Sequence, residues 1–245
     1  MSASTPILNA SAIEAFEGLD AQLRAWALGT GSEERRFATL IDAATLHAAG
    51  YPEAFPHLLM ASVVARDPSA ALTEANTSFT SWHLSPAVCY HAFAELAGRV
   101  LDEGAAITAR GTCFRHEDAD ALAPGRRQVE FEMREVILVG SSVWIEKRLA
   151  QFQPAITELA QDRGLEVTWC PANDPFFLPR ARGRAHMQRL LGTKLELCLP
   201  CGLAVASINR HGTYLTERFD IRLSDGSHAH SACVAFGLDR WAAHL

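Results

Sequence analysis

The segment 111–136 holds the residues of this 245-residue chain whose types and spacing are best suited to chemistry. It reads GTCFRHEDADALAPGRRQVEFEMREV, so Arg115 and Glu117 stand at the end of one predicted strand, and Phe131 and Glu135 stand on the next. Residues two apart on a strand share a face, and a guanidinium matches the oxygens of a phosphate or carboxylate. An isolated Arg-x-Glu is more often an exposed ion pair. The surrounding sequence has to decide between the two interpretations.

Thiols are the second kind of reactive group in the chain. The six cysteines are scattered, and their spacing is not typical of a disulfide framework; they stand at positions 89, 113, 170, 198, 201 and 233. Cys198 and Cys201 form a C-x-x-C motif, which is a candidate metal or redox pair. Because the motif has no second pair and does not open a helix, we interpret it as a structural turn.

The composition limits the class of protein. The chain is 49% hydrophobic and 20% charged with a net charge of −6, which is ordinary for a globular protein and disfavours generic nucleic-acid binding. The N-terminus has no basic segment followed by an apolar core, and the run LLMASVVA is too short to cross a bilayer. We therefore expect no membrane partner, a cytoplasmic location and reduced thiols.

The elements that position these residues are predicted from hydrophobic periodicity and from capping signals. Ser11 is the expected N-cap of a helix over 11–29, and Gly50 is expected to end a second helix over 34–49. Further helices are predicted over 85–101, 141–163 and 179–191, and from about Phe236. Strands are predicted over 58–65, 77–84, 106–117, 127–140, 165–170, 194–199, 202–210 and 216–223, the first of them buried.

The order of these elements indicates the fold class. Most strands after residue 105 follow one another as hairpins, with helices before and after them, which predicts an α+β fold built on an antiparallel sheet. No glycine-rich turn follows a first strand, so a dinucleotide-binding fold is disfavoured. We find no repeat and no linker, and we expect residues 1–245 to form a single domain.

Three segments resemble the motifs of class II aminoacyl-tRNA synthetases, the seryl type in particular. Residues 40–59 (LIDAATLHAAGYPEAFPHLL) resemble motif 1, CFRHE with VEFE resembles motif 2, and CVAFGLDRW, which contains Arg240, resembles motif 3. Ala235 stands where motif 3 usually has its first glycine. The match covers roughly residues 35–245. It implies a class II synthetase-like antiparallel sheet flanked by helices.

The resemblance implies that the hairpin binds ATP. Arg115 would be the catalytic residue, because a bidentate guanidinium suits the charge that builds on the α-phosphate when a carboxylate attacks it. Glu117 would accept a hydrogen bond from the adenine amino group. Phe131 and Arg240 would sandwich the adenine ring, each contact being worth about 1 kcal/mol. The correct order of the motifs favours these roles over an exposed ion pair.

Cys89, Glu135 and Cys233 lie far apart in sequence, but the resemblance brings them together. Two thiolates and a carboxylate with an open fourth position suit a catalytic zinc ion. The set resembles that of the zinc-dependent seryl enzymes of methanogens and, more closely, that of their truncated homologues, the amino acid:[carrier protein] ligases. In both groups zinc holds the α-amino group of the substrate, which also places Glu135 at the substrate. Each cysteine alone is more often a small buried hydrophobe.

Further nucleotide contacts are implied by the resemblance to the carrier ligases. Arg127 and Gln128 would contact the phosphates or the adenine of ATP, and Lys194 would reach the nucleotide, although a solvated strand end is its alternative interpretation. Glu196 is a weaker candidate for contact with the Mg²⁺ that accompanies ATP. The backbone of one further segment would approach the nucleotide, namely that of Ala204, Val205, Ala206 and Ser207.

The activity implied is the ATP-dependent activation of glycine or alanine, followed by transfer from the adenylate to the phosphopantetheine thiol of a carrier protein. About 30 residues precede the motif 1 region and WAAHL follows motif 3, so we expect neither a tRNA-binding domain nor a tRNA substrate. The arginine-rich segment 179–191 is a candidate docking surface for an acidic carrier, with a solvated helix face as the alternative. The motif 1 resemblance also implies a homodimer.

Two other functions stay open from the sequence. One is an aminoacyl-adenylate enzyme that acts on tRNA or on another acceptor. The other is a non-catalytic paralogue that serves as a binding or regulatory module. The presence of Arg115, Glu117, Phe131 and Arg240 argues against the second, because an inactive site has no physical need for them.

Overall fold

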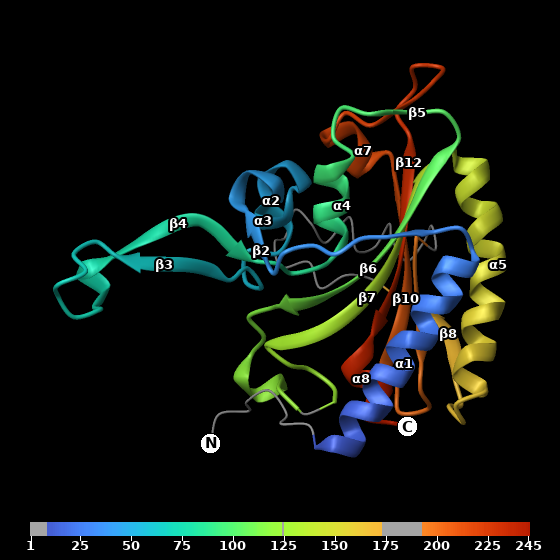
Figure 1. Cartoon of the computed structure of the whole chain (residues 1–245), viewed down its shortest axis with the longest axis horizontal. Helices are drawn as coiled ribbons and strands as arrows, with labels where there is room; N and C mark the ends of the chain where they lie inside the picture. The colour runs from blue at the N-terminus through green and yellow to red at the C-terminus, as the bar shows by residue number, and fades with distance from the viewer. Residues whose placement is uncertain (1–8, 124, 173–192) are drawn as a thin grey trace.

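A computed structural model describes residues 9–123, 125–172 and 193–245 (Figure 1). Its helices are α1 (Ala10–Gly29), α2 (Ala43–Ala49), α3 (Tyr51–Ala54), α4 (Cys89–Glu95), α5 (Ser142–Gln161), α7 (Tyr214–Arg218) and α8 (Leu238–Ala242). Its strands are β1 (Glu33–Glu34), β2 (Leu40–Asp42), β3 (Ala61–Ala65), β4 (Thr77–Leu84), β5 (Val100–Leu101), β6 (Gly104–Phe114), β7 (Glu130–Gly140), β8 (Thr168–Pro171), β9 (Lys194–Cys198), β10 (Ala204–Gly212), β11 (Arg222–Leu223) and β12 (His230–Gly237). The helix predicted over 179–191, with its candidate carrier surface, lies outside the described residues.

The centre of the fold is a seven-stranded sheet with the strand order β1-β6-β7-β12-β10-β9-β8. Its neighbouring strands are antiparallel except for β1 and β6, which are parallel. The predicted hairpin is β6–β7, which pairs Gly104 with Gly140 and Phe114 with Glu130 at its two ends. Strand β12 lies beside β7, so two segments far apart in sequence become neighbours. The predicted α+β class with an antiparallel sheet is confirmed.

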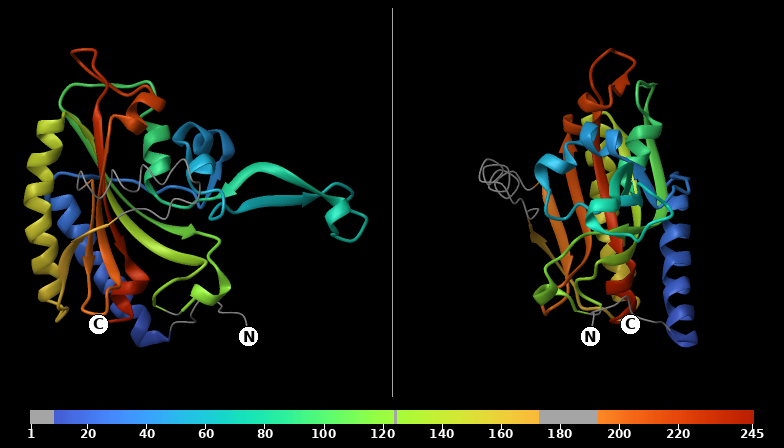
Figure 2. Two further views of the ribbon diagram at one scale, coloured as in Figure 1. Left: turned by 180° about the vertical axis from the view of Figure 1, so that it is seen from behind. Right: turned by 90° about the vertical axis from the view of Figure 1, so that its left-hand side faces the viewer.

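Both faces of this sheet are covered, which explains the almost continuous burial of β7. Helices α1 and α5 pack on one face, where Val136 and Leu138 meet Leu23 and Leu149 in the larger core (Figures 1 and 2). Successive residues of a strand point to opposite faces. The odd-numbered residues of β7 therefore face α4 and α7, where Ile137 belongs to a second core.

The two long helices predicted over 11–29 and 141–163 are confirmed as α1 and α5. Ser141 caps α5, whereas α1 is capped by Asn9 and not by Ser11, because the Asn9 side chain accepts a hydrogen bond from the N–H of Ala12. Among the helices in the described part of the chain, none is both long enough and apolar enough to span a bilayer.

A buried ion pair fixes α1 against the sheet. The Arg134 guanidinium donates from Nε and Nη2 to the two carboxylate oxygens of Asp20, at 2.6 and 2.9 Å. Both side chains are nearly inaccessible to solvent. Removing one partner of such a pair typically costs about 3–5 kcal/mol, because the other charge is left buried and unpaired. Arg134 precedes Glu135, so the pair also holds β7 in place behind the pocket described below.

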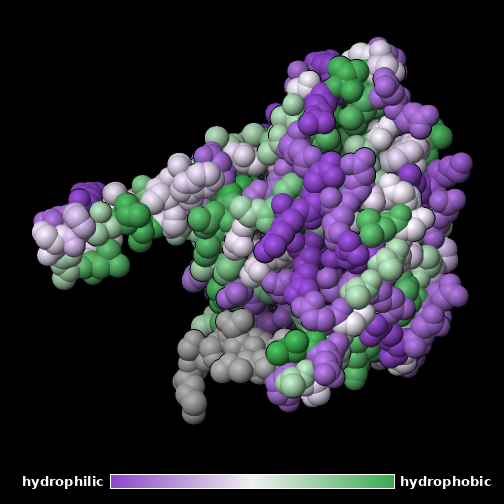
Figure 3. All heavy atoms as spheres, in the orientation of Figure 1, coloured by the Kyte–Doolittle hydropathy of each residue, from purple (hydrophilic) through white to green (hydrophobic). Residues whose placement is uncertain are grey.

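Strands β3 and β4 form a ribbon that projects from the body of the molecule, and we call residues 61–84 the arm (Figures 1 and 2). The strand predicted over 58–65 is confirmed as β3, but the expectation that it is buried is wrong, because the ribbon extends away from the sheet and no described layer covers it. Val63 pairs with Phe79, and Phe79 is 79% exposed. Figure 3 shows hydrophobic side chains along the arm.

The prediction of a helix over 34–49 is wrong for its first residues. Residues Glu33–Glu34 pair with β6 as β1, so long-range strand pairing overrides the local helical spacing. The helix begins only after Asp42, whose carboxylate accepts a hydrogen bond from the N–H of Ala44. Gly50 ends it with a φ of 72°, a left-handed conformation that favours glycine, as predicted.

Three further boundaries differ from the prediction. The helix predicted over 85–101 is restricted to α4, because residues 100–101 pair with β11. The strand predicted over 216–223 is instead helix α7 followed by the short β11. The last helix begins at Leu238, since Phe236 pairs with both neighbours of β12.

Candidate active site

A pocket of about 510 Å³ opens on the face of the sheet that carries α4. Its volume is in the range of cofactor-binding sites. Every site residue predicted from the sequence lines it, although these residues come from α4, β7, β9, β10, β12, α8 and the loop that connects β6 to β7. They are Cys89, Arg115, Glu117, Arg127, Gln128, Phe131, Glu135, Lys194, Ala204, Val205, Ala206, Ser207, Cys233 and Arg240.

The register of the sheet explains why residues so distant in sequence share one wall. Glu135 in β7 pairs with Ala235 in β12, and Cys233 pairs with Asn209 in β10. Directly paired residues of antiparallel strands point to the same face, with their Cβ atoms about 4.5–5.5 Å apart. Cys233 is separated from helix α8 by the last four residues of β12. It lies within β12, so that strand supplies it to the pocket wall.

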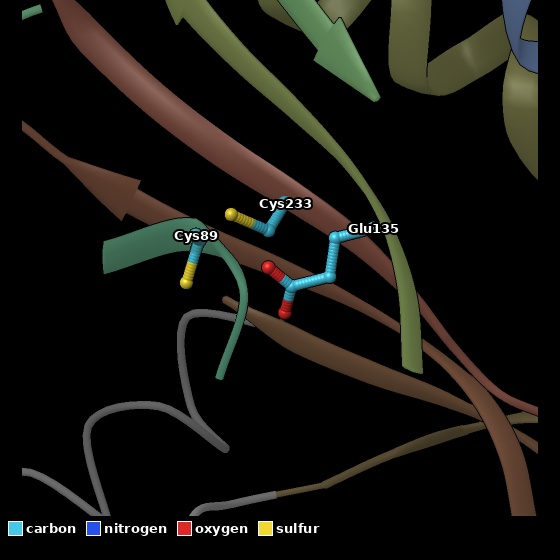
Figure 4. Close-up of side chains that lie close together, drawn as sticks. All are labelled: Cys89, Glu135 and Cys233. Carbon is cyan, nitrogen blue, oxygen red and sulfur yellow. The ribbon is translucent and has the colours of Figure 1, made fainter. Parts of the chain in front are cut away.

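Cys89, Glu135 and Cys233 form a compact buried cluster. Their sulfur and carboxylate oxygen atoms all lie within 4.8 Å of one another, and Figure 4 shows the three side chains around one common space. Cys89 is the first residue of α4, so a helix above the sheet contributes one thiol and the sheet contributes the other two groups. Within the described residues, Glu135 Oε2 is buried and has no hydrogen-bond partner.

The acid–base properties of the cluster follow from its burial. Burial raises the pKa of Glu135 to about 7, despite hydrogen bonds from Cys89. Hydrogen bonding with Cys233, and then burial, raise the pKa of Cys89 well above its usual range, and burial also raises that of Cys233. A cation among the three groups would reverse these shifts, because it favours the ionised forms. The donor set therefore fits a divalent cation such as zinc.

Arg115 lies just beyond the end of β6, which stops at Phe114 instead of continuing to Glu117 as predicted. Its Nε donates to the carbonyl oxygen of Pro86 at 3.1 Å, and its guanidinium carbon lies 5.0 Å from the centre of the Phe131 ring. These two contacts orient the guanidinium in the pocket wall. The ring predicted to stack on adenine therefore also stacks on an arginine.

Two ion pairs hold other predicted residues in the pocket wall. Arg127 Nη1 lies 2.9 Å from Glu117 Oε2, which ties the two ends of the loop between β6 and β7 together. Lys194 Nζ lies 3.2 Å from Glu196 Oε1 in β9. Lys194 is not a solvated strand end, because only 12% of its side chain is exposed.

Arg240 in α8 connects the loop before β7 to the start of β10. Its Nε donates to the carbonyl oxygen of Arg126 at 2.7 Å, and its Nη1 donates to that of Ala204 at 2.9 Å. Burial, and then the charge of Arg115, lower the pKa of Arg240. Arg115 and Arg240 therefore give this wall of the pocket positive charge, partly balanced by Glu117 and Glu196, which suits an anionic ligand such as a polyphosphate.

Comparison with characterised sequences decides the family. The chain is 31% identical over 231 residues to amino acid–[acyl-carrier-protein] ligase 2 of Bradyrhizobium diazoefficiens, a match that covers 86% of this chain and 68% of that protein. Ligase 1 of the same organism is 29% identical over the same share of this chain and 70% of its own length. The chain belongs to the amino acid–[acyl-carrier-protein] ligase family. It is a ligase enzyme, although no protein-family model matches it.

More distant relatives share the fold of this ligase. The type-2 serine–tRNA ligase of Methanocaldococcus jannaschii is 28% identical over 173 residues, which are 64% of this chain and 32% of that protein. M. kandleri SerRS, solved in complex with A. aeolicus tRNASec, superimposes with a TM-score of 0.76 at 20% identity over 93% of the ligase. The Naegleria fowleri serine–tRNA ligase solved with AMP gives 0.73 at 14% identity over 96%. The ligase spans about half the length of both solved chains.

Asp239 and Asn209 line the pocket and Trp241 is buried in the core behind it, and none of the three was predicted from the sequence. Asp239 Oδ2 accepts a hydrogen bond from the N–H of Glu132 at 2.5 Å, and Trp241 Nε1 donates to the carbonyl oxygen of Val205 at 2.8 Å. Both residues flank Arg240, so their position beside it in motif 3 was an available signal. Asn209, whose Nδ2 donates to Ser207 Oγ at 3.1 Å, follows Ser207 at the period of a strand.

Proposed function

We propose that this ligase activates a small amino acid, glycine or alanine, as its adenylate with magnesium-ATP. The aminoacyl group then passes to the phosphopantetheine thiol of a carrier protein. One observation carries this proposal: a single pocket contains both the buried cluster of Cys89, Glu135 and Cys233 and the guanidinium groups of Arg115 and Arg240. A site that joins an amine-binding cluster to a phosphate-binding wall suits amino-acid activation.

The cluster would hold one zinc ion through two thiolates and one carboxylate. The unpaired buried oxygen of Glu135 supports this assignment, because buried polar atoms normally have a partner. Zinc bound there would supply a Lewis acid that takes the α-amino group of the substrate as a neutral ligand, which rejects acids without an amine. Substrate orientation would then depend on the three protein ligands and on Asn209, which faces Cys233 across the strands.

The positive wall would bind ATP. Arg115 is held by the Pro86 carbonyl and by Phe131, so it would meet the α-phosphate in a fixed orientation and stabilise the charge that develops there. Glu117, held by Arg127, would accept a hydrogen bond from the adenine amino group. Arg240 would cover the second face of the adenine, and Lys194 would lie near the phosphates while Glu196 assists Mg²⁺.

The backbone of residues 204–207 is predicted to approach the nucleotide, but two of its carbonyl groups already accept hydrogen bonds within the protein. The carbonyl oxygens of Ala204 and Val205 accept hydrogen bonds from Arg240 and Trp241. We therefore propose that this segment shapes the nucleotide site through its position, with Ala206 and Ser207 closer to the ligand. This refines the nucleotide role expected for Ala204 and Val205.

The transfer step needs an acceptor thiol at the adenylate. The two Bradyrhizobium relatives are named as acyl-carrier-protein ligases, and this supports a carrier protein as the acceptor. The competing acceptor is tRNA, because more distant relatives are named serine–tRNA ligases. We favour the carrier, since the relatives of higher identity and coverage carry that name. We also propose that residues 1–245 act as one catalytic unit.

The deciding experiment is amino-acid-dependent ATP–pyrophosphate exchange with each of the twenty amino acids. We expect exchange with glycine or alanine, loss after chelation and recovery with zinc. Transfer would then be measured with three acceptors, namely holo carrier protein, the same carrier without phosphopantetheine, and total tRNA. Labelling of the holo carrier alone is expected. Labelling of tRNA would show that tRNA, and not the carrier protein, is the acceptor. If zinc-containing protein catalysed no ATP–pyrophosphate exchange, amino-acid activation would be refuted.

A further inference from the structure

Residues 85–88 follow the arm, lead into α4 and belong to no helix or strand. They lie between the two parts of the proposed site, because Cys89, the first residue of α4, comes directly after them and Arg115 contacts them. A segment without regular structure has no hydrogen-bond ladder of its own, so its backbone groups need other partners. The shape of this segment therefore depends on the individual hydrogen bonds that it makes.

Three consecutive carbonyl groups of the segment each accept a hydrogen bond. The N–H of Phe114 donates to the carbonyl oxygen of Ser85 at 2.8 Å, and Arg115 Nε donates to that of Pro86 at 3.1 Å. The Ser85 hydroxyl donates to the carbonyl oxygen of Ala87 at 2.9 Å. The first two bonds fasten the segment to the end of β6, and the third closes a turn within the segment.

The segment is also enclosed by packing. Ser85 and Val88 are both buried, and Val88 belongs to a small core that includes Met133. Gly111 in β6 leaves room for it, because a Cβ atom at Gly111 would lie 3.2 Å from Val88 Cγ2, which is closer than most such contacts. The N–H of Ser85 donates to the carbonyl oxygen of Thr39 at 3.0 Å. Close packing of this kind transmits a displacement from one end of the segment to the other.

The hydrogen bond of the Ser85 hydroxyl joins the two parts of the site. On one side of Ala87, the carbonyl group of Pro86 holds Arg115. On the other side, two residues further along, the Cys89 thiol belongs to the metal-binding cluster (Figure 4). Without the hydroxyl, the Ala87 carbonyl would lose this partner, and the turn between the two parts would lose the bond that closes it.

We propose that Ser85 is a positioning residue that couples the metal cluster to Arg115, so that a metal ion and ATP strengthen each other's binding. This inference rests on the proposed function. A metal ion held by Cys89 fixes the segment at one end, and a phosphate on Arg115 fixes the guanidinium that is bonded to its middle. Because both ligands bind best to the same arrangement of one segment, each lowers the dissociation constant of the other by the same factor. ATP is then bound tightly only when the amino-acid end of the pocket is assembled.

The first test needs no variant. Binding of magnesium-ATP is measured by equilibrium dialysis with full-length protein, either loaded with zinc or stripped with a chelator that is then removed. We expect zinc to lower the Kd for ATP about fivefold, at the lower end of typical couplings. Equal Kd values in the two forms would overturn the coupling. If neither form bound ATP, or if the protein took up no zinc, the proposed nucleotide site or the metal assignment would be refuted, and this inference with it.

The second test assigns the coupling to the Ser85 hydroxyl. In Ser85→Ala the ratio of the two Kd values should fall from about five to near one, whereas Ser85→Thr, which keeps a hydroxyl, should retain it. Thr216→Ala is the matched control, because Thr216 is also buried and its hydroxyl donates to the carbonyl oxygen of Thr213 at 3.0 Å, away from the pocket.

The ratio separates positioning from a general loss of stability, because each protein is compared with itself. A merely structural role of Ser85 would lower the unfolding temperature of Ser85→Ala and Thr216→Ala and leave the wild-type ratio in both, which would overturn the role of Ser85. The comparison of the two wild-type forms keeps the coupling testable even if Ser85→Ala does not fold.

Discussion

Arg115 illustrates how the neighbours of one residue define its chemistry. A mobile surface arginine would have to be ordered by its ligand, whereas this guanidinium is already held by the Pro86 carbonyl and the Phe131 ring. Preorganised donors stabilise a developing charge without reorganisation in the reaction, which is why they contribute strongly to catalysis. The same reasoning applies to Glu135, which is held between two thiols in a buried space.

Arg115→Ala is expected to lower the rate of ATP–pyrophosphate exchange by about 10²–10³-fold, because a charged donor to the α-phosphate is lost. Arg115→Lys should recover only part of that rate, since an ammonium cannot bind in a bidentate manner. Arg148→Ala is the matched control: Arg148 also stacks on an aromatic ring, Trp144 at 4.3 Å, but does not line the pocket. If Arg115→Ala and Arg148→Ala lowered the exchange rate equally, a role of Arg115 in the reaction would be contradicted.

Cys233→Ala is expected to remove bound zinc and, with it, amino-acid-dependent exchange. The control is Cys113→Ala, which deletes an equally buried free thiol outside the cluster. Metal content measured by plasma emission spectrometry should fall from about one zinc per chain to near zero only in Cys233→Ala, because two remaining ligands hold zinc poorly. Full zinc occupancy in the Cys233 variant would show that the cluster is not the metal site.

At the scale of elements, the short helix α8 organises the nucleotide end of the pocket. Three consecutive residues of this helix each hold a different backbone group: Asp239 holds β7, Arg240 holds the loop before it, and Trp241 holds β10. A five-residue helix has little stability by itself, so these contacts, with the burial of Trp241, define its position. The helix therefore positions the arginine that it carries.

Trp241→Phe should raise the KM for ATP about fivefold with little change in kcat, because the loss of one hydrogen bond of about 1 kcal/mol releases the Val205 carbonyl while most of the packing remains. Trp169→Phe is the control, since Trp169 Nε1 also donates a hydrogen bond, to Thr157 Oγ1 at 2.9 Å, away from the pocket. A merely structural role would lower the unfolding temperature of both variants and leave both KM values unchanged.

At the scale of the whole molecule, the arm is a projection that no other described part of the chain covers. It presents Val63, Leu72, Phe79 and Trp82 at exposures of 45–79%, which is unusual for several large apolar side chains on one projection. The region that resembles motif 1 leads directly into it. We therefore expect a second copy of the chain to cover part of the arm in a homodimer.

Light scattering of the wild type is expected to give the mass of a dimer, and Phe79→Ser should weaken the dimer by about tenfold or more, as loss of a central interface aromatic does. Val143→Ser is the control, because Val143 is similarly exposed, at 78%, but lies on α5 away from the arm. A monomeric wild type would exclude the dimer, and equal effects of the two variants would place its interface elsewhere.

The sequence by itself determined the residues that can do chemistry and the pattern that orders them. Arg115, Glu117, Phe131 and Arg240 were singled out by the resemblance of their segments to class II motifs, which implies a nucleotide site, and the β6–β7 hairpin was predictable from its alternation. Helices α1 and α5 were predictable because a long apolar stripe at helical spacing is a strong local signal. The predicted turn at Cys198–Cys201 also follows from local signals, a proline and a glycine.

Only the tertiary structure decided how these groups meet and which local patterns are overridden. Glu33–Glu34 becomes a strand because β6 offers it a partner, and residues 61–65 stay exposed because the arm leaves the body; neither fact is encoded within a few residues. The cluster of Cys89, Glu135 and Cys233 depends on β12 lying beside β7 and on α4 lying above them. Long-range register and burial set these distances, which is why the sequence could indicate the ligands only through resemblance and the fold alone could bring them within 4.8 Å.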